Sequence, residues 1–428
     1  MIKSNFKKLN FHFIINILIA FLPLSFIAGN SIINLNLILI ILTCITYWKS
    51  NFFKIKLFLI DKLLIFFFLF SIISGLINFF YFIENDASIA KENFIKSIVY
   101  TRYLLFYFSL RLIVENKYFN FKFFFLFSGI SVVFVSLDLI LQFYSGTDIF
   151  GFAKSQYRVS GPFGNELIAG SYLQRFSLFL FFVFIFFKDV LRKNTLILIL
   201  SILFVLIFFS VTIAGNRMPL VLFVLSFIIL FSFEKKLRKF FLILIPIISI
   251  VFFALYIFHP YIKDLTDHFL RLSVEIITSF DQIYDPKLNF TNMYLKEFNL
   301  GYMTWKENLI IGGGINSFYL NCKINFDICT NHPHNYYLEI LSELGIIGFI
   351  TFLMIVIKLF VLFFRVRKYL ADDLNKNLIT PFALLFFVEI FPIKTTGSFF
   401  TTGNASYIFF LIAVMIGLIN KTFYLKKN

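Results

Sequence analysis

Two histidines and several arginines are the residues of this sequence whose types and spacing suit chemistry. His332 and His334 stand in the segment HPHNYYLEILSELGIIG, directly before a run of helical apolar spacing. An exposed histidine can take a proton from a hydroxyl near neutral pH. An arginine stays charged and grips phosphate oxygens through two parallel hydrogen bonds. A base beside a phosphate site indicates a transferase with a lipid-phosphate donor.

Four arginines fall in the outer half of predicted membrane spans or in short outer loops, namely Arg102, Arg158, Arg175 and Arg217. A single arginine there would more often be an interfacial side chain that extends toward water. Several cations with few acids nearby instead predict an anion site at the outer surface, with Arg158, Arg175 and Arg102 as candidate diphosphate ligands beside Arg217.

Two acidic residues are expected to support this region. Asp138 lies one helical turn before Gln142 and shares its face, and Glu166 stands before the next apolar segment. A structural alternative is equally compatible with the spacing: Arg102 pairs with Asp138, and Glu389 pairs with Lys394, as contacts between helices.

Cysteines and glycines mark a loop before the histidines. Cys322 and Cys329 are expected outside the membrane, where a pair most often forms a disulfide. A zinc site with His332 and His334 is the alternative, but Cys-x6-Cys followed by His-x-His matches no common ligand pattern. Gly312–Gly314 predicts a turn rather than a nucleotide loop. We therefore expect a disulfide, no metal and no cofactor.

Composition says where these residues lie. The chain has 428 residues, of which 60% are hydrophobic and 14% charged, and its mean hydropathy is +0.88. Soluble domains are about 45–50% apolar and about 25% charged. A soluble enzyme, a disordered chain and a disulfide-rich secreted module are excluded. The net charge of +16 then indicates basic cytoplasmic loops rather than nucleic-acid binding.

About twelve apolar stretches are long enough to cross a bilayer core of about 30 Å. They lie near Phe11–Ile27, Ile32–Tyr47, Leu63–Phe82, Ile98–Val114, Phe123–Phe143, Ile168–Phe187, Thr195–Ile213, Pro219–Phe233, Phe240–Phe258, Ile346–Phe364, Leu378–Ile393 and Ala405–Ile419. Lysine and arginine concentrate in alternate loops, which predicts both termini in the cytoplasm. The expected fold is an all-α polytopic membrane protein with one long periplasmic loop.

This pattern divides the chain into three predicted parts. Residues 1–258 hold nine spans, residues 259–345 form the periplasmic loop, and residues 346–428 hold three spans and a cytoplasmic tail. Within the loop, Ile262–Tyr284 has apolar residues at helical spacing, which predicts an amphipathic helix on the membrane surface. Pro333 and Asn335 are typical of a helix start.

The segment HPHNYYLEILSELGIIG resembles the signature of the O-antigen ligase and O-antigen polymerase superfamily. The turn AGNRMPL, the stretch RVSGPFGNELIAGSYLQR and the span layout are also similar to it. The resemblance implies a GT-C-like, metal-independent inverting glycosyltransferase of the bacterial inner membrane. Its donor would be a glycan on undecaprenyl diphosphate, and its acceptor lipid A–core or another glycan.

By this resemblance His334 is the general base, Arg217 holds the diphosphate, and His332 orients the loop. Members often carry a second loop arginine shortly before the position of Trp305, and GYMTW has none. Lys306, Lys296 or Arg271 would have to substitute for it.

Three other functions compete with ligation to lipid A–core. A polysaccharide polymerase would use the same residues, so it is the closest alternative. A lipid-linked oligosaccharide flippase should show internal repeats and polar residues near the midplane. The sequence shows no such repeats, and its polar residues lie mostly in the outer half, with Lys358 as the exception. A non-catalytic scaffold would tolerate substitution of His334 and Arg217.

Overall fold

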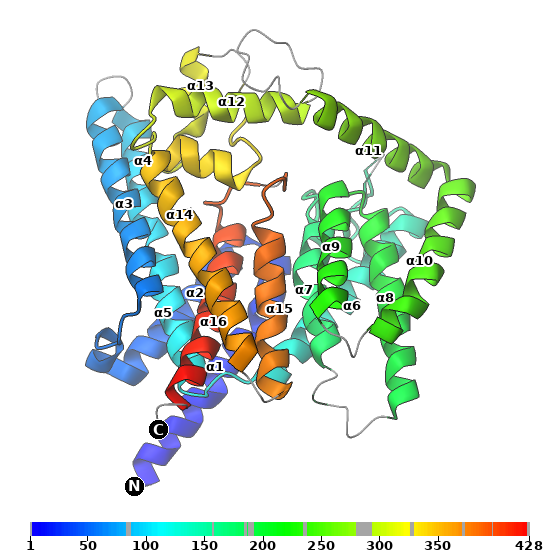
Figure 1. Ribbon diagram of the computed structural model, residues 1–428, viewed down its shortest axis with the longest axis horizontal. Coiled ribbons are helices and arrows are strands. Elements are labelled where there is room, and N and C mark those ends of the chain that lie inside the picture. Colours follow the sequence, from blue (N-terminus) through cyan, green and yellow to red (C-terminus); the bar gives the residue numbers. More distant parts are fainter. Residues whose placement is uncertain are drawn as a thin grey trace. The chain divides into compact units, whose positions relative to one another are not determined.

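The computed structural model describes residues 2–82, 87–155, 158–183, 186, 192–233, 238–279, 293–325, 329–369, 373–395 and 397–425. Within them the chain is built from helices, with one isolated bridge between Thr147 and Ala153 (Figure 1). The predicted all-α class is confirmed for these residues.

The chain forms two compact units, each assembled from distant segments. Unit 1 contains residues 1–40, 116–271 and 372–389, and unit 2 contains residues 41–115, 272–371 and 390–428. The predicted three-part division along the sequence stays a prediction beside this division by packing.

The helices of unit 1 are α1 (Ile2–Ala28), α6 (Phe121–Ser145), α7 (Ala169–Val183), α8 (Lys193–Ile213), α9 (Arg217–Phe233), α10 (Arg238–Phe258) and α15 (Asp373–Glu389). Those of unit 2 are α3 (Leu59–Phe82), α4 (Ala87–Tyr100), α5 (Arg102–Glu115), α12 (Met293–Glu307), α13 (Phe318–Asn325), α14 (Tyr336–Tyr369) and α16 (Thr402–Leu425). Helices α2 (Asn30–Trp48) and α11 (Pro260–Ser279) run from one unit into the other.

Each of the twelve predicted spans overlaps a helix. Within the described residues, eight helical stretches are long and apolar enough to cross a membrane: Asn10–Ala28, Asn30–Phe53, Leu59–Tyr81, Ala87–Glu115, Phe121–Ser145, Asn194–Ile213, Tyr336–Lys368 and Thr402–Lys421. A ninth arises if Ile245–Phe258 and Pro260–Glu275, joined by a bend, count together. Apolar helices Arg217–Phe233 and Leu378–Glu389 are shorter. The chain is therefore multi-pass, and the count of twelve stays a prediction.

Aromatic packing and helix caps organise unit 1. Phe124 on α6, Phe179 on α7 and Phe382 on α15 lie in mutual ring contact, with centroids 5.0–6.2 Å apart. The Asn120 side chain accepts a hydrogen bond from the Phe123 amide and so begins α6. Gly146 ends α6 with a φ of 89°, which glycine adopts without steric cost.

A buried ionic network joins three helices of unit 2. The Arg111 guanidinium on α5 lies 2.7 Å from the carboxylates of Asp61 on α3 and Glu115 on α5. Tyr107 donates a hydrogen bond to Asp61, and Asn420 on α16 donates one to Glu115. Because each charge meets an opposite charge or a donor, burying this network is tolerable.

A backbone kink divides α14 into a short first segment and a long second one. Gly345 has a φ of 60°, and a Cβ atom there would clash with the carbonyl oxygen of Ile310. The predicted Gly312–Gly314 turn packs at this kink, because the Gly313 and Gly314 amides donate to the Ser342 and Glu343 carbonyls. The kink sets the direction of the segment that begins after His334 (Figure 1).

Helix α11 confirms the helical part of the predicted amphipathic segment up to residue 279. Residues 280–284 of that prediction lie outside the described residues. Leu270, Val274 and Ile277 are exposed apolar side chains on α11.

Candidate active site

His334 precedes the first turn of α14 and is held by a strained backbone. Its φ of 50° lies in the left-handed region, which non-glycine residues rarely occupy outside sites that need it. Asn335 caps α14 as predicted, because its Oδ1 accepts from the amides of Tyr337 and Leu338. Its Nδ2 donates to the Pro392 carbonyl at 2.7 Å. The cap and this bond fix the residue next to His334.

Helix α12 approaches the histidine segment closely at a glycine. A Cβ atom on Gly301 would lie 2.8 Å from Cβ of Pro333 and 3.1 Å from Cβ of Leu338. Leu295 and Phe298 of α12 pack with Leu338. Glycine at position 301 therefore allows α12 to lie against the start of α14.

This approach brings a glutamate to His334. The Nε2 atom of His334 lies 3.5 Å from Oε1 of Glu297, whose side chain is 4% exposed, whereas that of His334 is 34% exposed. Burial raises the pKa of Glu297 to about 7. Its Oε2 atom is buried and makes no hydrogen bond within the described residues. The pair joins an accessible imidazole to a poorly solvated carboxyl group.

His332 lies beside His334 but in a different environment. The two ring centroids are 4.2 Å apart. Burial, followed by the effect of the neighbouring His334, lowers the pKa of His332 to about 4. His332 therefore stays neutral at physiological pH.

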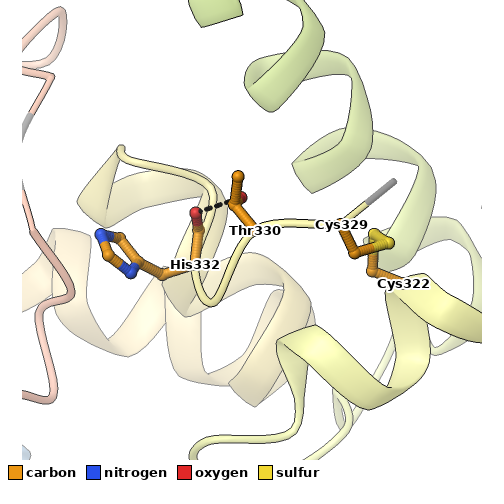
Figure 2. Close-up of a disulfide and its surroundings, with 4 residues drawn as sticks. All are labelled: Cys322, Cys329, Thr330 and His332. Carbon is orange, nitrogen blue, oxygen red and sulfur yellow. Dashed lines mark hydrogen bonds between the residues drawn. A yellow bond between two sulfur atoms is a disulfide. The ribbon is translucent and has the colours of Figure 1, made fainter. Parts of the chain in front are cut away.

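The disulfide between Cys322 and Cys329 is present as predicted. Figure 2 shows it joining α13 to the segment that continues to Thr330 and His332, where the Thr330 hydroxyl donates to the His332 carbonyl at 2.9 Å. The zinc alternative is wrong, because the two sulfur atoms bond to each other. No group of three or more metal-ligating side chains occurs among the described residues. The disulfide restricts the conformations available to the segment before the two histidines.

Arg217 is the first residue of α9 in unit 1, where it is partly buried. His268 on α11 interacts electrostatically with both Arg217 and Arg271. Arg271 is one of the three candidates for the second loop cation. Because His268 interacts with both arginines, Arg271 lies near Arg217.

Arg158 lies in the loop between α6 and α7 and acts electrostatically on the Tyr261 hydroxyl at the start of α11. Tyr261 in turn donates to the carbonyl of Ile213, the last residue of α8. Arg158 and the turn before Arg217 are thus both near the start of α11.

The predicted supporting acids hold loops rather than cations. Oδ1 of Asp138 accepts a hydrogen bond from the Ile149 amide at 2.8 Å. Gln142, on the same face as predicted, accepts from the Gly161 amide and donates to the Phe152 carbonyl. Both residues therefore fix the loop that contains Arg158. Glu166 is exposed within the same connection.

Arg175 already has a carboxylate partner within unit 1. Its Nη2 and Nε atoms lie 2.6 and 3.2 Å from the two carboxylate oxygens of Glu389. Glu389 thus pairs with Arg175 within unit 1. Lys394 belongs to unit 2, where its Nζ lies over the Tyr336 ring, 5.2 Å from its centroid. The alternative Glu389–Lys394 pair stays a prediction.

Arg102 begins α5 in unit 2. It donates to the Tyr103 hydroxyl at 2.7 Å, to the Val99 carbonyl and, at 3.5 Å, to Thr402. The alternative pairing with Asp138, which belongs to unit 1, stays a prediction.

Sequence reasoning missed Glu297. The available signal was an acid in YLKEFNLGYMTW, four positions before Gly301, on the same helix face. Its meaning appears only when α12 lies against α14.

The O-Antigen ligase family model matches residues 202–353. Residues 202–353 are thus similar to the O-antigen ligase family. The match includes Arg217, Glu297, the disulfide and both histidines, and it confirms the resemblance to the ligase and polymerase superfamily. A search of curated proteins finds no match.

Proposed function

We propose that this protein transfers a glycan from undecaprenyl diphosphate to an acceptor hydroxyl at the periplasmic face of the bacterial inner membrane, with both termini in the cytoplasm. The observation that carries the proposal is an accessible histidine at the strained start of α14, inside the segment that matches the ligase family. Lipid A–core is the acceptor we favour, because the segment around His334 resembles the ligase signature.

In this mechanism His334 accepts the proton of the acceptor hydroxyl as its oxygen forms a bond to the anomeric carbon. The bond from that carbon to the diphosphate oxygen breaks, and its electron pair leaves with the diphosphate. Attack from the opposite side inverts the anomeric centre. The proton passes from His334 to water after product formation. The proposed step uses neither a metal ion nor a nucleotide.

Arg217 would bind the diphosphate as negative charge grows on the leaving oxygen, where a fixed donor stabilises the transition state most. Arg271 and Arg158 are the supporting cations we favour, because both lie near elements that approach Arg217. Arg175 is a weaker candidate, since Glu389 already occupies its guanidinium.

Polymerisation is the second candidate function, because the same base and diphosphate site suit an acceptor that is itself a lipid-linked glycan. The test uses purified protein with undecaprenyl-diphosphate glycan, lipid A–core and EDTA, without added nucleotide. Glycan on lipid A–core supports the ligase. A ladder of longer lipid-linked chains supports the polymerase, and neither product from well-folded protein with several donor glycans contradicts both.

A further inference from the structure

The loop region of unit 2 contains a carboxyl group that the mechanism above does not use. Glu297 is 3% exposed as a whole residue, which is unusual for a glutamate without a lysine or arginine partner. Within the described residues its ionic contact is with His334, at 3.5 Å. Its second oxygen, Oε2, is buried without a hydrogen bond.

From this geometry we propose that Glu297 is a positioning residue for His334: its carboxylate orients the imidazole through Nε2 and stabilises the imidazolium that forms when the acceptor hydroxyl loses its proton. The inference rests on the proposed function and deepens it. The two side chains come from α12 and from the residue before the cap of α14, so helix packing fixes their separation.

The contact determines which imidazole nitrogen can act as the base. A carboxylate facing Nε2 favours the tautomer that carries its hydrogen there. Nδ1 is then the nitrogen with the lone pair that accepts the substrate proton. When His334 becomes positive, the carboxylate and the imidazolium form an ion pair in a poorly solvated setting, where opposite charges attract more strongly than in water.

The charge state of Glu297 supports this role. Burial alone accounts for its raised pKa, so an adjacent positive charge on His334 would favour the carboxylate form. The neighbouring His332 stays neutral, so it supplies no competing positive charge. A buried carboxyl group next to a histidine suits a site where that histidine becomes positively charged for part of the reaction.

The strained backbone is a second, independent indication. His334 has a positive φ although glycine or asparagine would adopt it at lower cost. Strain of this kind persists where the surroundings fix it and is common at active sites. Here Gly301 on one side and the Asn335 cap on the other hold the His334 backbone where its ring meets Glu297.

The first test measures the tautomer of His334 and needs no enzymatic assay. Full-length protein is labelled with ¹⁵N-histidine and placed in lipid nanodiscs at pH 8, and the His334 signal is identified by its loss in His334→Asn. We expect the Nε2–H tautomer to dominate in the wild type and the tautomer population to change in Glu297→Gln and Glu297→Leu. An unchanged tautomer in both folded variants would overturn the proposal.

The second test measures catalysis. In the glycan-transfer assay, we expect Glu297→Gln to lower kcat by about 10- to 100-fold with little change in KM for donor or acceptor, and Glu297→Asp to recover part of the rate. The matched control is Glu307→Gln, an exposed glutamate at the end of the same helix. Equal kcat values for Glu297→Gln and Glu307→Gln would refute a positioning role.

The two tests separate the two proposals. If the wild type shows no transfer with any donor, the proposed function fails, and the tautomer measurement still decides whether Glu297 controls His334. If transfer occurs and depends on His334 while Glu297→Gln matches the control, the function stands and the role of Glu297 falls.

Discussion

Two buried glutamates with ionic contacts differ sharply in this protein. In unit 1, Glu389 receives two contacts from the guanidinium of Arg175, at 2.6 and 3.2 Å, and its side chain is fully buried. In unit 2, Glu297 has one contact at 3.5 Å to a histidine that is one-third exposed, and one carboxylate oxygen has no hydrogen bond.

The difference teaches how to tell a structural ion pair from a functional one. A buried carboxylate with both oxygens matched contributes to a fixed arrangement of helices, and losing its partner leaves an uncompensated charge. A buried carboxyl group with an oxygen that accepts no hydrogen bond carries a desolvation cost, and packing alone does not explain why that cost is tolerated. Such groups are concentrated at sites where charge changes during function.

Removing the imidazole of His334 should have the largest effect on activity. We expect His334→Ala to lower the glycan-transfer rate by about 10³-fold, because a general base contributes about 10²–10⁴, with little change in folding. Product formation by purified protein in nanodiscs measures the rate, and size exclusion with circular dichroism checks folding. A variant that keeps more than a tenth of the wild-type rate would contradict the assignment.

Arg217 should behave differently from Arg175. We expect Arg217→Ala to lower the transfer rate by about 10²-fold, the typical cost of losing a donor to a developing oxyanion. Arg217→Lys should recover little of it, because a point charge lacks the bidentate geometry of a guanidinium. The assay at saturating donor measures kcat, and a Lys variant at wild-type rate would refute a bidentate phosphate contact.

Arg175 should reveal itself through stability. Arg175→Met removes the guanidinium that contacts both oxygens of the buried Glu389 carboxylate, and it is expected to cost about 3 kcal/mol or more. The double variant Arg175→Met with Glu389→Leu should recover most of the loss. Thermal unfolding in detergent measures both, and a single variant as stable as the wild type would show that this pair does not stabilise unit 1.

Glu297 should show the opposite sign in stability. Its pKa rises from 4.5 to about 7 on folding, so the folded protein binds more protons than the unfolded chain between these pH values, and stability falls as pH rises through that window. At pH 8 this penalty is on the order of 3 kcal/mol.

Glu297→Gln removes this penalty. We expect the variant to unfold at a higher temperature than the wild type at pH 8, with a smaller difference at pH 5, while it transfers glycan more slowly. Thermal unfolding at the two pH values measures the difference. The opposite result is a variant that unfolds at a lower temperature than the wild type at pH 8, with a smaller deficit at pH 5. It would show that Glu297 stabilises the fold as Glu389 does.

Much of the fold could be predicted from the sequence because the bilayer fixes the length and apolarity of its helices. The disulfide and the Asn335 cap were also predictable, since both depend on residues close in sequence. The decisive pairs were not. Glu297 and His334 are separated along the chain by the end of α12, the whole of α13 and the disulfide, and Arg175 and Glu389 are 214 residues apart. Their meeting depends on helix packing, which spacing along one chain does not report.

The most direct test of the account compares the wild type, His334→Ala and Arg217→Ala in one reconstituted reaction. Each receives undecaprenyl-diphosphate glycan, lipid A–core and EDTA, and both the glycan product and the released undecaprenyl diphosphate are quantified. We expect the wild type to form the two products in equal amounts, and each variant to form both of them at least about 100-fold more slowly. Transfer by both folded variants at the wild-type rate would contradict it.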